Sequence, residues 1–460
     1  MRKQKISVLR VFLLLLFCFA LTKAAYAGPL IEFGDEGFLQ MDVKLQAYAE
    51  NTDFGSGENG TSSRTDLHFQ RTRLTLKGMI NETWGVVFQT CGNCGSSKTP
   101  LGYMYSLTTN DWNDRDVRII DAYIIGNFDK ALNMKLGLTK IPLTRANLDD
   151  CFAPLSLDRS MFVYTPYGGS PAKFSRDIGL VFWGTFFDDK LKYWAGVFEG
   201  REGTNKWTFS SPTKVAGATS LTPGMAYDTS PEPKSNFEYV ARIHYAFLDP
   251  EPGSGYQGTY FGKKKILTIG IGAAYEADAA FKNVNPNMKE PGVADTGVTV
   301  LNDETVDYKA YTADIMFEYP LQFGVVTVNG QYLKIDFNNA YKTNKSPADR
   351  NSFVAGMNGQ KEGMFGKFAY MLPFTLGKEG KLQPYVLYEH WKFAHLLGVD
   401  EQKITQTGVG INYYIKKQQV RITAEYLKTE FDQKTGMIGL AAPRMLDSFD
   451  TFRMMFQLVL

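Results

Sequence analysis

The sequence predicts an all-β fold, a transmembrane antiparallel β-barrel of about sixteen strands with short periplasmic turns and long extracellular loops. Three observations support this prediction. Counting back from Leu460, every second residue is apolar as far as Phe452, which places them on one face of a final strand. The first 27 residues resemble a secretory signal. Between these ends, short turns alternate with long loops.

Residues 1–27 have a basic start, an apolar run over 11–21 and the small-residue triplet A-Y-A directly before Gly28. This layout predicts cleavage after Ala27. Cys18 lies inside the apolar run between two phenylalanines, so a lipid anchor on its thiol is not favoured. We therefore expect a signal peptide over 1–27 and a single barrel domain over 28–460.

Composition excludes several classes of protein. Beyond the signal, no apolar stretch approaches the roughly 20 residues that a membrane-spanning helix needs. Removing the five basic residues of the signal changes the formal charge from +2 to −3, which does not support a nucleic-acid-binding surface. Length alone also allows two soluble periplasmic domains, but the strand pattern favours a barrel in contact with outer-membrane lipid.

The first mature strand shows the pattern most clearly, because Leu39, Met41 and Val43 alternate with polar residues. Sixteen such segments can be counted, and an even count places both chain ends in the periplasm, although eighteen strands remain an alternative. The connection over 249–265 is long where a tight turn is expected, and we interpret it as an extended periplasmic turn. The long loops are expected near 51–65, 92–115, 142–175, 201–236, 278–306, 338–361, 392–402 and 431–447.

Four segments resemble the phosphate-selective porins O and P, an outer-membrane family. They are F-Q-R-T-R-L-T-L-K-G from Phe69, the stretch over 121–149, the strand pair over 175–200 and the pair over 408–428. The resemblance implies a sixteen-stranded barrel, a homotrimer, and a third loop over 142–175 that folds inward and constricts the lumen. It also implies basic residues that guide anions such as phosphate.

Two positions depart from that family pattern. The second strand of the family commonly carries adjacent arginines, whereas Gln70 precedes Arg71 here. A later strand often carries a central arginine, whereas Leu387 stands here. The sequence therefore predicts passive diffusion of small hydrophilic solutes and leaves the anion preference open.

A diffusion channel needs charges along a water-filled lumen and has no need of a catalytic group, metal or cofactor. Arg71, Arg73 and Lys77 alternate along the second strand and form a basic ladder on its polar face. The full set of candidate pore-lining residues is Lys44, Arg71, Arg73, Lys77, Lys140, Arg145, Arg242 and Arg421.

The alternative for these bases is that they pair with luminal acids and only stabilise the wall. Arg453 also lies on a polar face. The acids expected to face inward are Asp42, Asp314, Glu318, Glu389 and Glu425.

The motif C-G-N-C contains Cys91 and Cys94, which we expect to form a local disulfide, because no histidine follows to attach haem. Cys151 in the third loop is either a free thiol or a partner of one of these. The same motif gives slight support to an alternative function, a barrel that serves as a sleeve or docking component of an envelope electron-transfer complex. An enzyme is not expected, because no serine accompanies His244 in a plausible triad.

Overall fold

The structure is a computed structural model that describes residues 28–56, 62–92, 117–160, 162–163, 175–200, 207–208, 226–227, 236–281, 284–285, 299–300, 305–337, 360–396, 399–436 and 445–460. The predicted signal peptide lies outside these residues. Within them, no helix is long and apolar enough to cross a membrane.

The described strands form one closed antiparallel sheet. Each long strand pairs with its sequence neighbours, and the last pairs with the first from Lys44↔Val459 to Asp53↔Asp450, which closes the ring. The short strand β1 (Leu30–Phe33) pairs with β2 and is not part of the ring. The predicted sixteen-stranded barrel is confirmed.

The ring consists of β2 (Gly37–Ser56), β3 (Ser62–Met79), β4 (Trp84–Gly92), β5 (Val117–Asn127), β6 (Asn133–Lys140), β7 (Arg176–Phe186), β8 (Leu191–Phe198), β11 (Glu238–Ala246), β12 (Ile266–Phe281), β15 (Thr305–Leu321), β16 (Gly324–Asp336), β17 (Lys361–Met371), β18 (Lys381–Phe393), β21 (Lys403–Lys416), β22 (Val420–Gly436) and β23 (Met445–Val459). Three short pairs lie outside the ring: β9 (Trp207–Thr208) with β10 (Ala226–Tyr227), β13 (Val284–Asn285) with β14 (Thr299–Val300), and β19 (His395–Leu396) with β20 (Val399–Asp400). The described helix is α3 (Arg145–Leu148).

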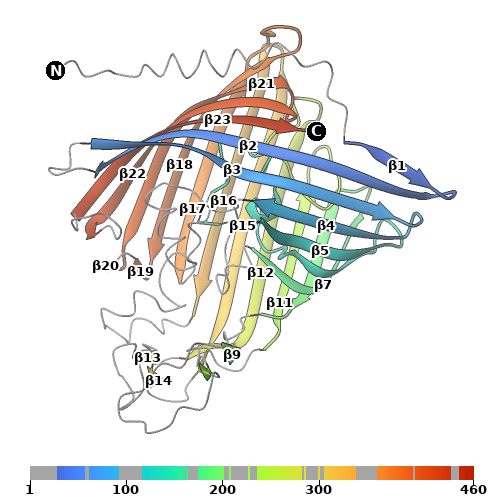
Figure 1. The fold of residues 1–460 in the computed structure, drawn as a ribbon, viewed down its shortest axis with the longest axis horizontal. Coiled ribbons are helices and arrows are strands. Elements are labelled where there is room, and N and C mark those ends of the chain that lie inside the picture. The colour runs from blue at the N-terminus through green and yellow to red at the C-terminus, as the bar shows by residue number, and fades with distance from the viewer. Residues whose placement is uncertain are drawn as a thin grey trace.

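The strands are strongly tilted, as closure of a barrel requires. In Figure 1 the blue strands β2 and β3 cross in front of the yellow and orange strands behind them at a large angle. The red strand β23 lies beside β2, where the ring closes. Short turns join β3 to β4 and β15 to β16, as the predicted alternation of short turns and long loops expects.

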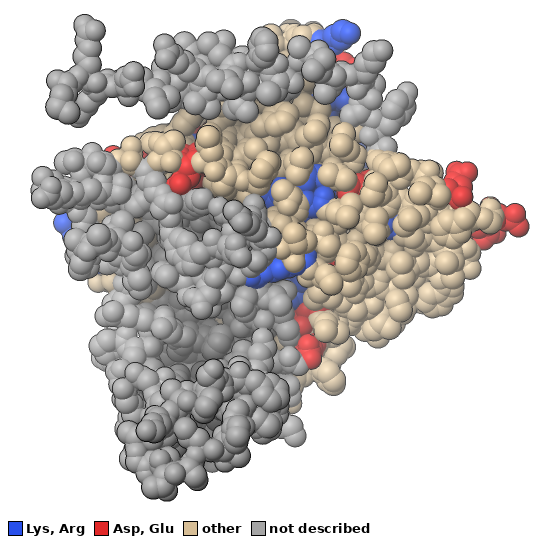
Figure 2. Space-filling model, in the orientation of Figure 1, with Lys and Arg blue, Asp and Glu red and all other residues tan. Residues whose placement is uncertain are grey.

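The outward face of the barrel is apolar. On β12, Ile269, Ile271 and Tyr275 remain largely exposed, and comparable exposed apolar residues occur on strands all around the ring. Among the described residues, the face seen in Figure 2 carries few charged side chains. Exposed apolar surface on this scale is costly in water, so this face suits lipid.

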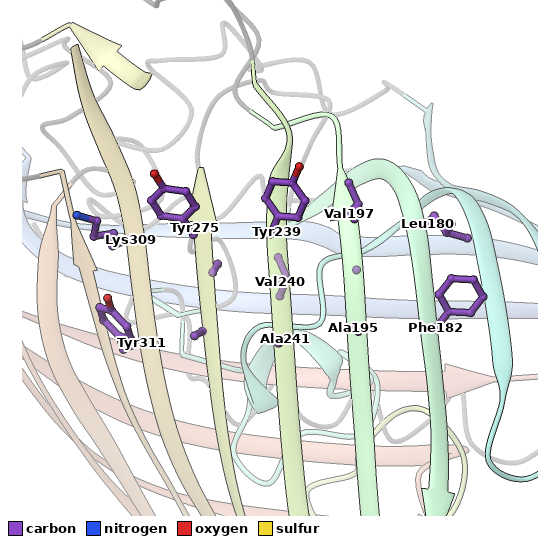
Figure 3. A pocket seen from close by; sticks show the side chains of 13 residues that line it. Leu180, Phe182, Ala195, Val197, Tyr239, Val240, Ala241, Tyr275, Lys309 and Tyr311 are labelled. Atoms are coloured by element: carbon purple, nitrogen blue, oxygen red, sulfur yellow. The ribbon is translucent and has the colours of Figure 1, made fainter. Parts of the chain in front are cut away.

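A depression of about 510 Å³ interrupts the outward face across β8, β11 and β12. Its floor is a row of three alanines aligned across the strands, Ala195, Ala241 and Ala273. Figure 3 shows Tyr239 and Tyr275 side by side at one edge of this row. Small residues therefore leave space between larger ones on the lipid-facing wall.

The inward face changes character along the barrel. On β16, Thr327, Asn329 and Gln331 face inward near the short-turn end, whereas buried Leu333 and Ile335 follow toward the long-loop end. The sequence predicts a polar inner face along the whole length of the strands. The structure corrects this prediction, because the inner face toward the long loops is apolar at Leu333 and Ile335. These side chains belong to one buried apolar cluster, to which the third loop also contributes.

Candidate channel interior

The described part of the third loop, 141–160, lies inside the barrel and contacts its wall at many points. Thr144 caps α3 by accepting a hydrogen bond from the backbone N–H of Asn147 at 3.0 Å. From this helical turn to residue 157, backbone groups of the loop bond to inward side chains of distant strands. The wall partners are Gln331 on β16, Tyr385 on β18, Asn412 on β21, Arg421 on β22, and Gln46 and Gln457, which pair where β2 meets β23.

The ladder predicted on the second strand lies on β3, and its three members have different surroundings. Arg71 is buried and donates two hydrogen bonds to the carboxylate of Asp158 in the third loop, at 2.9 and 2.8 Å. Arg73 is buried with its guanidinium 5.5 Å from the ring centre of Phe152. Lys77 is half-buried. Arg71 therefore anchors the loop, whereas Lys77 keeps access to the lumen.

Lys44 and Lys140 lie beside the turn of the third loop at Asp149 and Asp150. The Lys44 ammonium is 3.2 Å from the Asp150 carboxylate, and Lys140 donates to the Asp149 carbonyl at 2.9 Å. Burial alone would raise the pKa of the Asp150 carboxyl, but Lys44, Arg73 and Lys140 outweigh it and hold this pKa well below its ordinary range. Asp150 therefore stays ionised within a basic cluster.

The remaining predicted arginines are buried and bound to protein groups. Arg145 on α3 donates to both carboxylate oxygens of Glu251, at 2.8 and 2.5 Å. Arg242 on β11 forms an ion pair with Asp314 at 2.7 Å. Arg421 on β22 donates to a loop carbonyl at 2.8 Å. These three arginines are bound to protein groups that satisfy part of their charge. They therefore influence a passing solute mainly by fixing the positions of the inserted loops.

The predicted inward acids divide between two roles. Asp314 pairs with Arg242, and Glu425 pairs with Arg453, as the wall-pairing alternative expects. Glu389 accepts a hydrogen bond from Ser160 of the third loop at 2.6 Å. Glu318 accepts backbone N–H groups from residues 260 and 262. Luminal acids therefore hold inserted segments as well as neighbouring strands.

The connection between β11 and β12 differs from its prediction. It joins these strands at the short-turn end, but residues 251–262 fold into the lumen instead of extending outward. Tyr256 is almost fully buried there, and its hydroxyl lies 2.6 Å from Nδ1 of His244 on β11. The compact, polar interior offers this segment more hydrogen-bond partners than an extended turn would have.

Water-accessible luminal side chains gather on β2 to β6. Lys44, Lys77, Lys135 and Lys140 are each partly exposed there. Arg118 of β5 is partly exposed as well, and the partly exposed acids of this region are Asp42, Asp66, Asp150 and Asp158. The clearest local excess lies around Asp150, where Lys44, Lys140 and buried Arg73 place three basic groups beside one carboxylate and give this part of the wall a positive balance.

Sequence reasoning missed three of the central residues. Glu251 and Tyr256 lie in the connection that was expected to form an extended periplasmic turn, and Lys135 was not among the candidate pore-lining residues. One signal was available: the length of the 249–265 connection, which exceeds what a short turn needs.

The structure answers part of the question of how the cysteines pair. Cys91 on β4 is disulfide-bonded, and Cys151 is a free, buried cysteine. A bridge between these two is therefore excluded. Cys94 lies outside the described residues, so its pairing with Cys91 stays a prediction.

Comparison with known structures identifies the architecture. An anion-selective porin from Comamonas acidovorans superposes with a TM-score of 0.50 at 11% identity, over 92% of this chain and all of that one. The fold is that of a porin. This porin fold is an outer-membrane β-barrel of the Gram-negative type, in agreement with the sequence prediction.

The chain is also similar to other proteins. The DcaP channel of Acinetobacter baumannii gives a TM-score of 0.47 at 12% identity, over 94% of this chain and all of that one. The trimer form of OmpT from Vibrio cholerae gives 0.45 at 12% identity, over 93% of this chain and all of that one. An uncharacterized protein of Aquifex aeolicus (strain VF5) is 22% identical over 391 residues, which are 83% of this chain and 80% of that protein. No family model matches the chain.

Proposed function

We propose that this protein is an outer-membrane porin that lets small hydrophilic solutes diffuse passively and favours anions. The observation that carries the proposal is the basic cluster of Lys44, Arg73 and Lys140 around the single carboxylate of Asp150, inside a closed porin barrel. In a narrow aqueous passage with low-dielectric walls, such a balance lowers the barrier for anions. The third loop over 142–175 is the proposed constriction, because its described residues cross the lumen.

We also propose phosphate as a specific solute and a homotrimer as the assembly. Phosphate as a specific solute is supported by the resemblance to phosphate-selective porins and by the basic cluster around Asp150. Assembly as a homotrimer is supported by the same resemblance. We include both as proposals that follow from the general function.

The test is the reversal potential of single channels in a planar bilayer, measured with the refolded mature chain under a salt gradient. We expect open channels with anion selectivity in chloride, and a reduced current when phosphate is added if phosphate binds the basic cluster. A barrel that serves only as a sleeve for a partner would not conduct alone.

A charge variant links that selectivity to named residues. In R73Q/K77Q, two luminal cations become neutral while Arg71 still anchors the third loop, so the reversal potential should move toward the cation side. The matched control is K130Q/K378Q, which removes the same charge from exposed turns. An unchanged reversal potential in R73Q/K77Q would refute the anion-selecting role of β3.

A further inference from the structure

The segment 251–262 crosses the interior from one side of the barrel to the other. On one side, Lys192 of β8 donates to the carbonyls of residues 251 and 253, both at 2.7 Å. On the opposite side, the ring of Phe261 lies edge-on to Tyr414 of β21, with centroids 4.9 Å apart. Six strands of the ring lie between β8 and β21 along one arc. The segment therefore lies across the interior instead of along one wall.

The same segment is joined to the third loop. The backbone of Tyr256 pairs with the loop, since its carbonyl accepts from Asp150 N–H at 3.2 Å and its N–H donates to the Leu148 carbonyl at 3.4 Å. The Gly258 N–H donates to the Ala153 carbonyl at 2.7 Å. Two insertions that enter from opposite ends of the barrel thus form one continuous layer.

A buried ion pair fastens this layer. Arg145 of the loop and Glu251 of the connection form two parallel hydrogen bonds, and both side chains are at most 1% exposed. Tyr260 donates a third hydrogen bond to the same carboxylate at 2.6 Å. The face of Tyr256 lies 4.1 Å from the Arg145 guanidinium. Removing either charge would leave the other buried without its partner, which is strongly unfavourable.

In the half of the barrel near the short turns, the layer covers one sector of the inner wall and leaves another partly open. Polar inward side chains on β12 to β22 are only 0–5% exposed, although threonine, asparagine and glutamine would normally face water in a diffusion channel. This covered set is Thr268, Thr312, Thr327, Asn329, Gln331, Gln383, Gln406, Asn412 and Thr423. On β2 to β5, by contrast, Gln40, Thr75 and Gln89 in the half near the short turns are partly exposed, whereas Gln46, Thr52 and Gln70 toward the long loops are buried.

We infer that the third loop and the segment 251–262 together form a septum that, in the half of the barrel near the short turns, closes the β12–β22 sector and confines solutes to a passage along β2 to β6. The Arg145–Glu251 pair is the clasp of this septum, and the connection at the short-turn end is a second element that sets pore size. Only the conductance measurement described below depends on the proposed porin function. The position of the septum itself is a property of the folded barrel.

The first experiment compares two luminal threonines after substitution by cysteine. T75C on β3 and T268C on β12 are matched changes of similar size, made in a C151S background to remove the free thiol. A charged, water-soluble methanethiosulfonate reagent should modify Cys at position 75 rapidly and leave position 268 unmodified. Equal modification rates at the two positions would overturn the septum, whether or not the barrel conducts.

The second experiment opens the clasp. E251A should raise single-channel conductance, weaken ion selectivity and make T268C reactive, because the septum loses its fastening. The control E362A removes a half-exposed ion pair with Lys334 and should change none of these. Unchanged conductance in E251A together with an unreactive T268C would refute the clasp. If no variant conducts while the two cysteines still differ, the porin function fails and the septum stands.

Discussion

At the scale of single residues, paired charges in the interior fix protein segments more than they contact solute. Arg71, Arg145 and Arg421 were predicted from their spacing on polar strand faces or from their place beside the third loop. In the structure all three bond to inserted loops. Lys135 also donates to Ser254 of an inserted segment, at 2.9 Å, so partly exposed Lys77 is the better candidate for direct contact with a passing anion.

The clasp residue Glu251 gives a prediction about pH. Burial alone would raise the pKa of its carboxyl, but Arg145 and the hydrogen bond from Tyr260 outweigh burial and lower the pKa to about 2. The folded-state pKa is thus below the ordinary value of a glutamate, so the stabilisation is present above about pH 4.3 and is lost as pH falls through about 2. A difference of this size corresponds to about 3 kcal/mol.

We therefore expect conductance to be constant between pH 8 and pH 5 as far as the clasp is concerned, and to rise only in strong acid. Single-channel recordings from pH 8 down into strong acid measure this dependence. The variant E251Q carries no titrating group at this position and should lack the acid step. A conductance step near pH 6 in the native chain that E251Q abolishes would contradict the assigned state of the clasp.

At the scale of elements, sequence patterns predicted the strands well and the inserted segments poorly. A period of two determines which side chains of a strand share a face, so β2 and β3 could be located from residues such as Leu39 and Arg73. Loop conformation depends on partners far away in the chain, such as Asn412 for the carbonyl of residue 155. No local pattern encodes these partners, which is why the inward fold of 251–262 was missed.

The strand β6 contains a position where only glycine fits. Gly137 has a φ of +129°, and a Cβ placed there would lie 2.4 Å from the carbonyl oxygen of Ala122 on β5. We expect G137A to destabilise the barrel by about 1–3 kcal/mol, because the backbone must move or hold strain.

Urea unfolding of the refolded barrel in detergent, followed by tryptophan fluorescence, measures this change. The matched control is G366A on β17, where an added Cβ meets no atom within 4 Å. Equal unfolding midpoints for G137A and G366A would show that β6 tolerates a side chain at this position.

At the scale of the whole molecule, two kinds of contact hold the barrel together. Neighbouring strands form the ring, and the septum braces its interior. The sequence could predict the ring because every strand carries its own pattern and the turns set the order. The bracing could not be predicted, because it joins residues as distant as Gln46 and Cys151, whose proximity exists only once the ring has closed.

Closure of the ring depends on its last strand. β23 pairs with β22 on one side and with β2 on the other, so deleting residues 453–460 removes half of the last strand and opens two edges of the sheet. Unpaired backbone groups at an edge cannot be satisfied in lipid, where each costs several kcal/mol. We expect the truncated chain to lose the faster migration of a folded barrel on unheated SDS gels.

Deleting residues 30–35 is the control, because β1 pairs only along β2 and the ring stays closed without it. If the C-terminal deletion kept the migration of the folded barrel, the bonds between β2 and β23 would not be what holds the ring closed.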